Sequence, residues 1–128
     1  MKQFLLPLCV LVALTSLQSC KSKFPFSKEW ELTELNGQQV PAGTRITIVF
    51  DQNNTRYRGS ASCNNYNGQF TLKGKSLSLG NGAATKKMCP NMEWEDKYLP
   101  VLSKIDGWKV ADNQLHLTSG GSVVASYK

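Results

Sequence analysis

The chain has few of the side chains that carry most catalysis and metal binding. Its 128 residues include one histidine, His116, and four cysteines. A structural zinc site takes four ligands, usually Cys and His, and no local Cys/His spacing supplies them here. One catalytic hypothesis is that Cys63 acts as a nucleophile with His116 as its base. The simpler interpretation is that His116 is a lone histidine on a strand or at the surface. We therefore expect no enzyme, metal or cofactor.

Acidic residues are scarce as well. Nine Asp and Glu stand against fifteen Lys and Arg, a formal net charge of +6. Such an excess suits acidic lipid or polysaccharide surfaces, or serves only solubility, and we expect a monomer that binds no nucleic acid. Glu93, Glu95 and Asp96 could supply paired carboxylates for glycoside hydrolysis. Three acids in the first turn of a helix more often complement the helix dipole.

No long hydrophobic run is present either. The apolar stretch 4–14 is shorter than the roughly 20 residues of a spanning helix, and it follows Lys2, as in an export signal. It leads into Leu17-Gln18-Ser19-Cys20, which resembles the bacterial lipobox. The resemblance implies that Cys20 is acylated and becomes the first residue of the mature chain. The alternatives are a secretory signal cleaved elsewhere, or a core helix.

The leader divides the chain into three parts. Residues 1–19 are predicted to be a lipoprotein signal peptide, 20–28 a lipidated N-terminus and tether, and 29–128 one folded domain. We expect the lipid on Cys20 to hold the protein in the bacterial cell envelope, on the periplasmic face of the outer membrane. Several acyl chains at about 0.8 kcal/mol per buried methylene make such an anchor effectively permanent.

This division also accounts for the cysteines. Cys9 leaves with the leader and Cys20 takes the lipid, so Cys63 and Cys89 remain. Disulfides persist in an oxidising envelope, and we expect these two thiols to pair.

From Trp30 onward, apolar and polar residues mostly alternate, the period of half-buried strands. Frequent turn signals such as Asn36-Gly37 separate the runs. The pattern predicts a mainly β (α+β) domain, a small antiparallel incomplete barrel of roughly seven to eight strands with one helix packed on or in it. The segments with strand character are residues 30–35, 38–40, 45–50, 55–61, 69–72, 76–79, 83–88, 108–111, 115–118 and 122–127.

One segment has helical spacing, at about residues 91–105. Trp94, Tyr98 and Val101 lie four and three residues apart on one face. Pro100 removes a helix hydrogen bond and clashes with the carbonyl of residue 96. We therefore expect a kink or two shorter pieces.

Two short segments carry a family resemblance. Cys63-Asn64-Asn65-Tyr66-Asn67-Gly68 and Thr85-Lys86-Lys87-Met88-Cys89, in order after Trp30-Glu31-Leu32, resemble the META domain of HslJ-like bacterial lipoproteins. The resemblance implies the same pairing of Cys63 with Cys89. It also implies an incomplete antiparallel barrel with a packed helix and no enzymatic activity.

The candidate binding residues are polar and lie near the cysteines or on one strand. The amides at positions 64, 65 and 67 either shape a tight corner or form a polar pocket. Arg56 and Arg58 share the strand face opposite Tyr57; with Lys86 and Lys87 they could form a cationic patch. The predicted binding residues are Asn64, Asn65, Tyr66, Lys86, Lys87, Arg56 and Arg58.

The partners such a site suits are an anionic lipid, lipopolysaccharide or an envelope protein. Trp94, Tyr98 and Trp108 are either core aromatics or the lining of an apolar groove for an acyl chain or peptide. The resemblance implies a non-catalytic binding or chaperone-like module in envelope stress or homeostasis. The alternative is a small proteinaceous inhibitor of an envelope hydrolase, which would present a rigid loop around Asn36 or Asn53.

Overall fold

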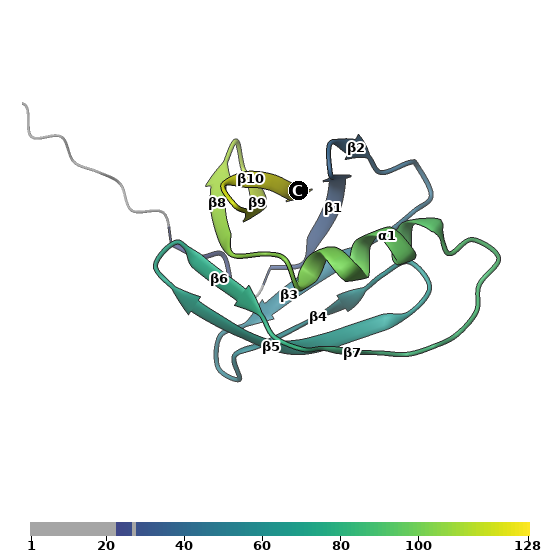
Figure 1. The fold of residues 1–128 in the computed structure, drawn as a ribbon, viewed down its shortest axis with the longest axis horizontal. Coiled ribbons are helices and arrows are strands. Elements are labelled where there is room, and N and C mark those ends of the chain that lie inside the picture. Colours follow the sequence, from purple (N-terminus) through teal and green to yellow (C-terminus); the bar gives the residue numbers. More distant parts are fainter. Residues whose placement is uncertain (1–22, 27) are drawn as a thin grey trace, which may run out of the picture.

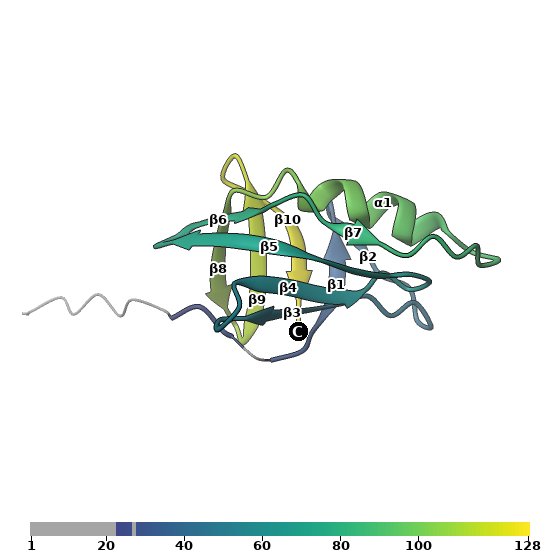
Figure 2. The same ribbon diagram turned by 90° about the horizontal axis from the view of Figure 1, so that it is seen from below.

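A computed structural model describes residues 23–26 and 28–128 of the chain. The predicted signal peptide 1–19 and the predicted acylation of Cys20 lie outside these residues. The described part contains ten strands and one helix (Figures 1 and 2). None of its helices is long and apolar enough to cross a membrane. The strands are β1 (Trp30–Leu35), β2 (Gln38–Gln39), β3 (Thr47–Asp51), β4 (Arg56–Ser60), β5 (Asn65–Lys73), β6 (Ser76–Leu79), β7 (Ala83–Ala84), β8 (Gly107–Ala111), β9 (Gln114–Ser119) and β10 (Ser122–Tyr127), and the helix is α1 (Glu93–Leu102).

The strands form a ring of antiparallel neighbours. Their order is β10-β9-β8-β6-β5-β4-β3-β1-β2, β7 adds to β5, and β10 pairs with β1 to close the ring. Two contacts in the ring are narrow: β6 meets β8 at one residue pair, and β1 meets β3 at two. The predicted mainly β fold with one helix is therefore confirmed, with more strands than expected.

The alternation of side chains sets the register where one face is buried. In β5, Tyr66, Gly68 and Phe70 point inward and the residues between them are exposed. In β4, Tyr57 is buried between the exposed Arg56 and Arg58, as the alternation predicted.

One predicted strand is much shorter than expected. Instead of residues 83–88, only Ala83 and Ala84 form β7. After that the backbone leaves β5, because Lys87 bonds to Asn64 and Cys89 reaches Cys63. Conversely, β5 begins at Asn65, four residues before the predicted start.

The helix is one piece, also shorter than predicted. Asn91 Oδ1 accepts a hydrogen bond from the backbone N–H of Glu93 at 3.1 Å, which supports the start of α1. Pro100 lies inside α1 without dividing it, so the expectation of two shorter pieces is wrong. Pro100 removes one backbone hydrogen bond, and only two residues of α1 follow it. Little of the helix therefore lies beyond the proline.

The helix closes one side of the ring through Tyr98, which is completely buried. Tyr66 on β5 and Tyr127 on β10 place their hydroxyl groups 2.7 Å and 2.9 Å from that of Tyr98. The Tyr66 hydroxyl donates to the carbonyl oxygen of Thr47 at 2.7 Å. Because each hydroxyl has one proton and a carbonyl can only accept, the donations run in one direction, from Tyr127 through Tyr98 and Tyr66 to Thr47.

The segment before β1 is part of the folded domain. Phe24 is 8% exposed, and its ring lies 4.9 Å from Phe50 and 5.0 Å from Trp108, centroid to centroid. Phe26 packs against Phe24 and Phe70. The predicted tether 20–28 was therefore drawn too long, because two apolar side chains near its end pack on the core.

Candidate functional site

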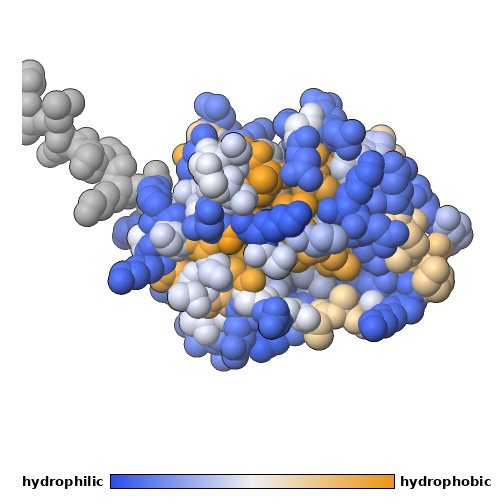
Figure 3. Space-filling model, in the orientation of Figure 1, coloured by the Kyte–Doolittle hydropathy of each residue, from blue (hydrophilic) through white to orange (hydrophobic). Residues whose placement is uncertain are grey.

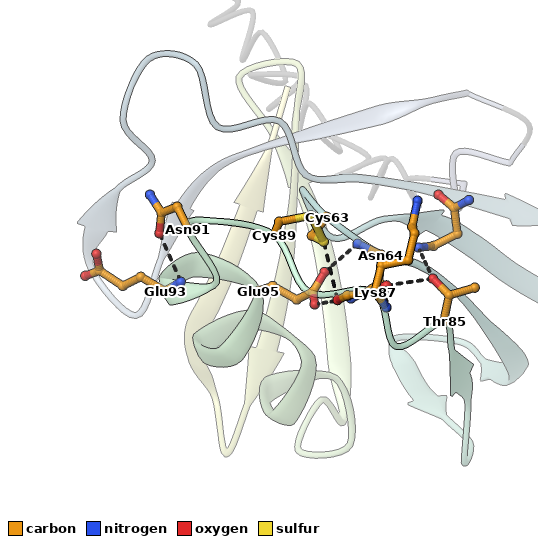
Figure 4. The surroundings of a disulfide bond; sticks show 9 residues. Cys63, Asn64, Thr85, Lys87, Cys89, Asn91, Glu93 and Glu95 are labelled. Atoms are coloured by element: carbon orange, nitrogen blue, oxygen red, sulfur yellow. Dashed lines mark hydrogen bonds between the residues drawn. A yellow bond between two sulfur atoms is a disulfide. The ribbon is translucent and has the colours of Figure 1, made fainter.

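The centre of the predicted site is a disulfide bond, which Figure 4 shows with its surroundings. Cys63 and Cys89 are bonded, with their Cα atoms 6.0 Å apart and a sequence separation of 26. This confirms the pairing. The bond joins the turn before β5 to the segment that leads into α1, so it fixes where the helix enters the fold.

Asn64, next to this disulfide, is a buried hydrogen-bonding centre. Its side-chain oxygen accepts from the Thr85 hydroxyl at 2.9 Å and from the Lys87 backbone N–H at 2.7 Å. Its amide nitrogen donates to the Lys87 carbonyl at 3.0 Å and to Glu95 at 2.6 Å. Of the two interpretations, a tight corner or a polar pocket, the contacts of Asn64 fit the tight corner. Its amide group bonds to the protein itself.

Glu95 is the residue that the sequence did not single out for this role. It is 3% exposed, and its two oxygens accept from the backbone N–H of Asn64 at 2.7 Å and from the Asn64 amide. Its position in the first turn of α1 fits the helix dipole as predicted. The carboxylate also ties the helix to the disulfide loop.

We call Cys63, Asn64, Lys87, Cys89 and Glu95 together the clip. A carboxyl group such as that of Glu95 is buried only when hydrogen bonds compensate for the hydration that it loses. Here both oxygens are occupied, so the clip is a fixed structural unit of the domain.

The residues considered for catalysis are placed separately. Cys63 has no free thiol, and His116 lies on β9 with Nδ1 2.8 Å from the Ser126 hydroxyl oxygen. Glu93 forms an ion pair with Lys97 at 2.9 Å. Within residues 23–26 and 28–128, no three His, Cys, Asp or Glu side chains gather as metal ligands do.

A groove of about 640 Å³ crosses the outer face of β3, β4 and β5. We call it the arginine groove, because Arg56 and Arg58 stand in its middle strand. Arg56 Nη2 donates to Asn67 Oδ1 at 2.6 Å, so one guanidinium is held over β5. The groove is lined by Glu29, Thr47, Val49, Asp51, Arg56, Tyr57, Arg58, Gly59, Ser60, Asn65, Tyr66 and Asn67.

The charges of the arginine groove are partly organised. Hydrogen bonding from Asn54, with a smaller contribution from nearby Arg58, lowers the pKa of Asp51 below its ordinary value. Asp51 is thus an anion at neutral pH. Glu29, at the rim, is paired with Arg45. The two arginines remain the groove's cationic groups.

Lys86 and Lys87 do not line this groove. β5 lies between them and β4, because Asn67 pairs with Arg58 on one side and with Ala83 on the other. Neighbouring strands lie about 4.8 Å apart, so two strands separate the pairs by roughly 10 Å before the offset along the chain is added. Lys86 and Lys87 therefore do not share the groove of Arg56 and Arg58, and their part in binding stays a prediction.

The remaining predicted residues divide between the groove and the core. Asn65 is exposed and lines the arginine groove. Tyr66 also contributes to the lining, but its ring is buried. Its hydroxyl belongs to the row of hydrogen-bonded hydroxyls of Tyr127, Tyr98 and Tyr66, which we call the tyrosine chain. Tyr98 and Trp108 are core residues too, and Trp94 packs at the edge of the core. Asn67, one of the amides considered for a polar pocket, also lines the groove. Ser60 completes it and was not singled out by the sequence, since it lies at the half-buried end of β4.

A second hollow of about 630 Å³ lies beside β1 and β10. Its lining includes Glu31, Glu34, His116 and Lys128. Glu31 already binds Arg45 at 3.1 Å, and His116 contacts Ser126. The charges do not single out this hollow. The face of the molecule in Figure 3 mixes hydrophilic residues with apolar areas.

The fold and the clip define a class: a small ring of antiparallel strands, fixed by one disulfide and closed by a helix whose acid is buried beside it. The chain belongs to the META domain family, whose sequence model matches residues 24–128. The match begins at Phe24, the residue at which the core begins.

Two solved structures are similar. One, an NMR structure of a protein from Burkholderia xenovorans, is 26% identical with a TM-score of 0.62, covering 80% of this chain and 81% of that one. Another NMR structure is 23% identical with a TM-score of 0.60, covering 77% and 86%, and it supports the fold alone. No curated protein matches the chain.

Proposed function

We propose that this protein is a lipid-anchored component of the bacterial cell envelope whose META domain is a non-catalytic binding module, chaperone-like in its use. The observation that carries the proposal is the arginine groove, which presents two guanidinium groups among amide and hydroxyl side chains. Membership of the META domain family supports an envelope-related role. The lipobox-like sequence at Cys20 supplies the anchor.

The packing of the interior supports a ligand site on the outside of the domain. Tyr98 fills the space under α1 and is 0% exposed, and Trp108 is 5% exposed. Both use their polar atoms on protein partners, Trp108 Nε1 donating to the Gly74 carbonyl at 2.8 Å. An acyl chain bound in place of these rings would leave buried polar groups unpaired, which is costly. The ligand of this module therefore binds at the surface.

The side chains of the arginine groove indicate the chemistry of that ligand. A guanidinium binds carboxylate or phosphate oxygens through paired hydrogen bonds. Ser60, Asn65 and Asn67 add donors and acceptors of the kind that recognise hydroxyls or amides. A phosphorylated, hydroxyl-rich envelope glycolipid such as lipopolysaccharide carries both sets of groups.

The double change Arg56→Glu and Arg58→Glu is expected to weaken binding of lipopolysaccharide by at least about tenfold at low salt, since both cationic groups of the groove become anionic. Both side chains are exposed, so the unfolding midpoint should stay unchanged. Titration of immobilised lipopolysaccharide at several salt concentrations measures the effect.

The matched control is Lys86→Glu with Lys87→Glu, an equal charge change outside the groove. If both double variants lose binding equally, the net charge of the chain is responsible and the groove is not the site. If wild-type protein does not distinguish lipopolysaccharide from a neutral glycolipid, the ligand class is wrong.

Cys20→Ala is expected to move the protein from the membrane fraction to the soluble fraction, because the lipid is attached to that thiol. Metabolic labelling with palmitate followed by fractionation tests it. Persistent labelling of the variant would contradict the lipidation site. Cys9→Ala, a change within the leader, is the control that should leave both readouts unchanged.

A small proteinaceous inhibitor of an envelope hydrolase is the second candidate. The filled interior and the rigid Asn36-Gly37 turn favour it: Asn36 has a φ of 48° and its N–H donates to the Val124 carbonyl at 2.8 Å. Native mass spectrometry of protein purified from the envelope separates the two functions. A co-purified glycolipid supports the binding module, and a stoichiometric hydrolase supports the inhibitor.

A further inference from the structure

The chain leaves the folded domain at a defined end of the ring. Phe24 packs against Phe50, Phe70 and Trp108, the last two at centroid distances of 6.4 Å and 5.0 Å. Pro25 is held as well, since its carbonyl oxygen accepts from Trp30 Nε1 at 3.4 Å. The first residues of the domain are thus fixed to its core, and this end of the molecule lies opposite the loop that enters α1 (Figures 1 and 2).

Exposed lysines surround this exit. Lys75 Nζ lies 4.0 Å from the ring centroid of Trp108, the same ring that packs on Phe24. Lys28 Nζ lies 3.9 Å from the ring of Trp30, which holds Pro25. Lys23 directly precedes Phe24, and Lys73 begins the turn that contains Lys75.

These cations are available to an external anion. Among the ion pairs of the described residues, none includes Lys23, Lys28, Lys73 or Lys75. Glu29, next to Lys28 in the sequence, is paired with Arg45, and Asp106, which lines a small hollow with Lys73, accepts a hydrogen bond from the Gly120 N–H at 3.0 Å. Cation–π contacts hold two of the lysines in place without neutralising them. We call the four lysines the exit face.

The distance to the proposed anchor is short. Lys21, Ser22 and Lys23 are the only residues between Cys20 and Phe24. Four residue steps of extended chain reach at most about 14 Å. A lipid on Cys20 therefore holds Phe24 within that distance of the bilayer surface, and only the end of the ring where the chain exits can face the membrane.

We propose that the exit face lies against the anionic phospholipid headgroups of the bilayer that holds the acyl chains of Cys20. The proposal rests on the lipid anchor proposed above. Lysines near an anionic surface each add to attraction that decays within a Debye length, about 8 Å at physiological salt, and the tether keeps the exit face close to that range. The clip and the entry to α1 then point away from the bilayer, toward soluble partners.

Lysine footprinting of the full lipidated protein tests this orientation. The protein is reconstituted into vesicles of phosphatidylcholine alone, or with three-tenths phosphatidylglycerol, and acetylated briefly before mass spectrometry. In anionic vesicles, acetylation of Lys23, Lys28, Lys73 and Lys75 should fall at least about fivefold relative to neutral vesicles. Lys86, Lys87 and Lys97, in the distal loop and helix, should react equally in both.

A second experiment does not depend on the anchor. The unlipidated Cys20→Ser chain is sedimented with the same anionic vesicles at low salt. Lys73→Glu with Lys75→Glu should lower the bound fraction at least about tenfold, whereas Lys86→Glu with Lys87→Glu should not.

The outcomes separate the two proposals. If the protein floats with vesicles but its lysines react equally in both compositions, the anchor stands and the exit face is wrong. If it does not float, but the Lys73/Lys75 variant alone loses vesicle binding, the anchor is wrong and the exit face stands. Protection of Lys86 and Lys87 in place of the exit face would overturn the orientation.

Discussion

Removing the Cys63–Cys89 disulfide is expected to lower the free energy of unfolding by about 3–4 kcal/mol. The bond closes a loop of 26 residues, and the chain-entropy relation assigns about that value to a loop of this length. A domain of about 100 residues has only roughly 5–15 kcal/mol of stability. The variant Cys63→Ser with Cys89→Ser should therefore unfold at a much lower urea concentration.

Urea titration of the oxidised wild type, the reduced wild type and the double variant measures this loss. The last two should agree, since both lack the bond. Met88→Ala is a matched control in the same segment, because Met88 is 86% exposed and its loss removes no contact of the clip. A loss below about 1 kcal/mol in the double variant would mean that Asn64 and Glu95 hold the clip without the disulfide.

Alkaline pH is the second condition expected to have a large effect. Burial raises the pKa of Tyr66, Tyr98 and Tyr127 well above the ordinary value of 10, and the neighbouring hydroxyls add to the rise at Tyr127. A group whose folded pKa is raised contributes stability that is fully present below its unfolded pKa. That stability is lost as pH rises from about 10 toward the folded pKa.

The expected slope follows from the protons involved. Above pH 10 the unfolded chain releases up to three tyrosine protons that the folded chain retains, and each lowers the free energy of unfolding by about 1.4 kcal/mol per pH unit. Stability should thus fall by up to about 4 kcal/mol per pH unit. Urea midpoints between pH 9 and 11 measure the slope, with tyrosinate absorbance following the same transition.

Tyr98→Phe is the control for this slope. It removes one titrating hydroxyl, so the slope should fall by about a third, whatever the variant costs at neutral pH. Every other side chain is unchanged in the variant, so the difference in slope isolates the contribution of Tyr98. Ionisation of more than one of the four tyrosines in a chain that stays folded would contradict the prediction, since only Tyr57 lies outside the chain of hydroxyls.

The sequence predicted the features that depend on local pattern and on counting. Alternation placed Tyr57 inward and Arg56 and Arg58 outward, because successive side chains in a strand point to opposite faces. Counting the cysteines gave the pair Cys63 and Cys89, since Cys9 was assigned to the leader and Cys20 to the lipid.

Contacts between distant segments were beyond local pattern. Glu95 looks like any acid in the first turn of a helix, and its bonds to Asn64 join residues 31 apart in sequence. Phe24 sits just after a polar stretch that resembles a tether, and only the open end of the ring gives its ring a place to pack. Lys86 and Lys87 were grouped with the arginines because the disulfide was expected to bring them alongside the arginine strand, whereas β5 lies between.

The ring is closed by its first and last strands, so the contact between β1 and β10 can form only after the rest of the domain has been synthesised. β10 pairs with β1, Lys128 exchanges two backbone hydrogen bonds with Glu31, and Tyr127 supplies the outermost hydroxyl of the tyrosine chain. β10 leaves the ribosome after every other element of the domain. Until it arrives, Leu32 and Leu35 of β1 lack their partner strand, and the seam stays open. The ring therefore cannot close until the last strand of the domain has been synthesised, and β1 waits for its partner from the far end of the domain.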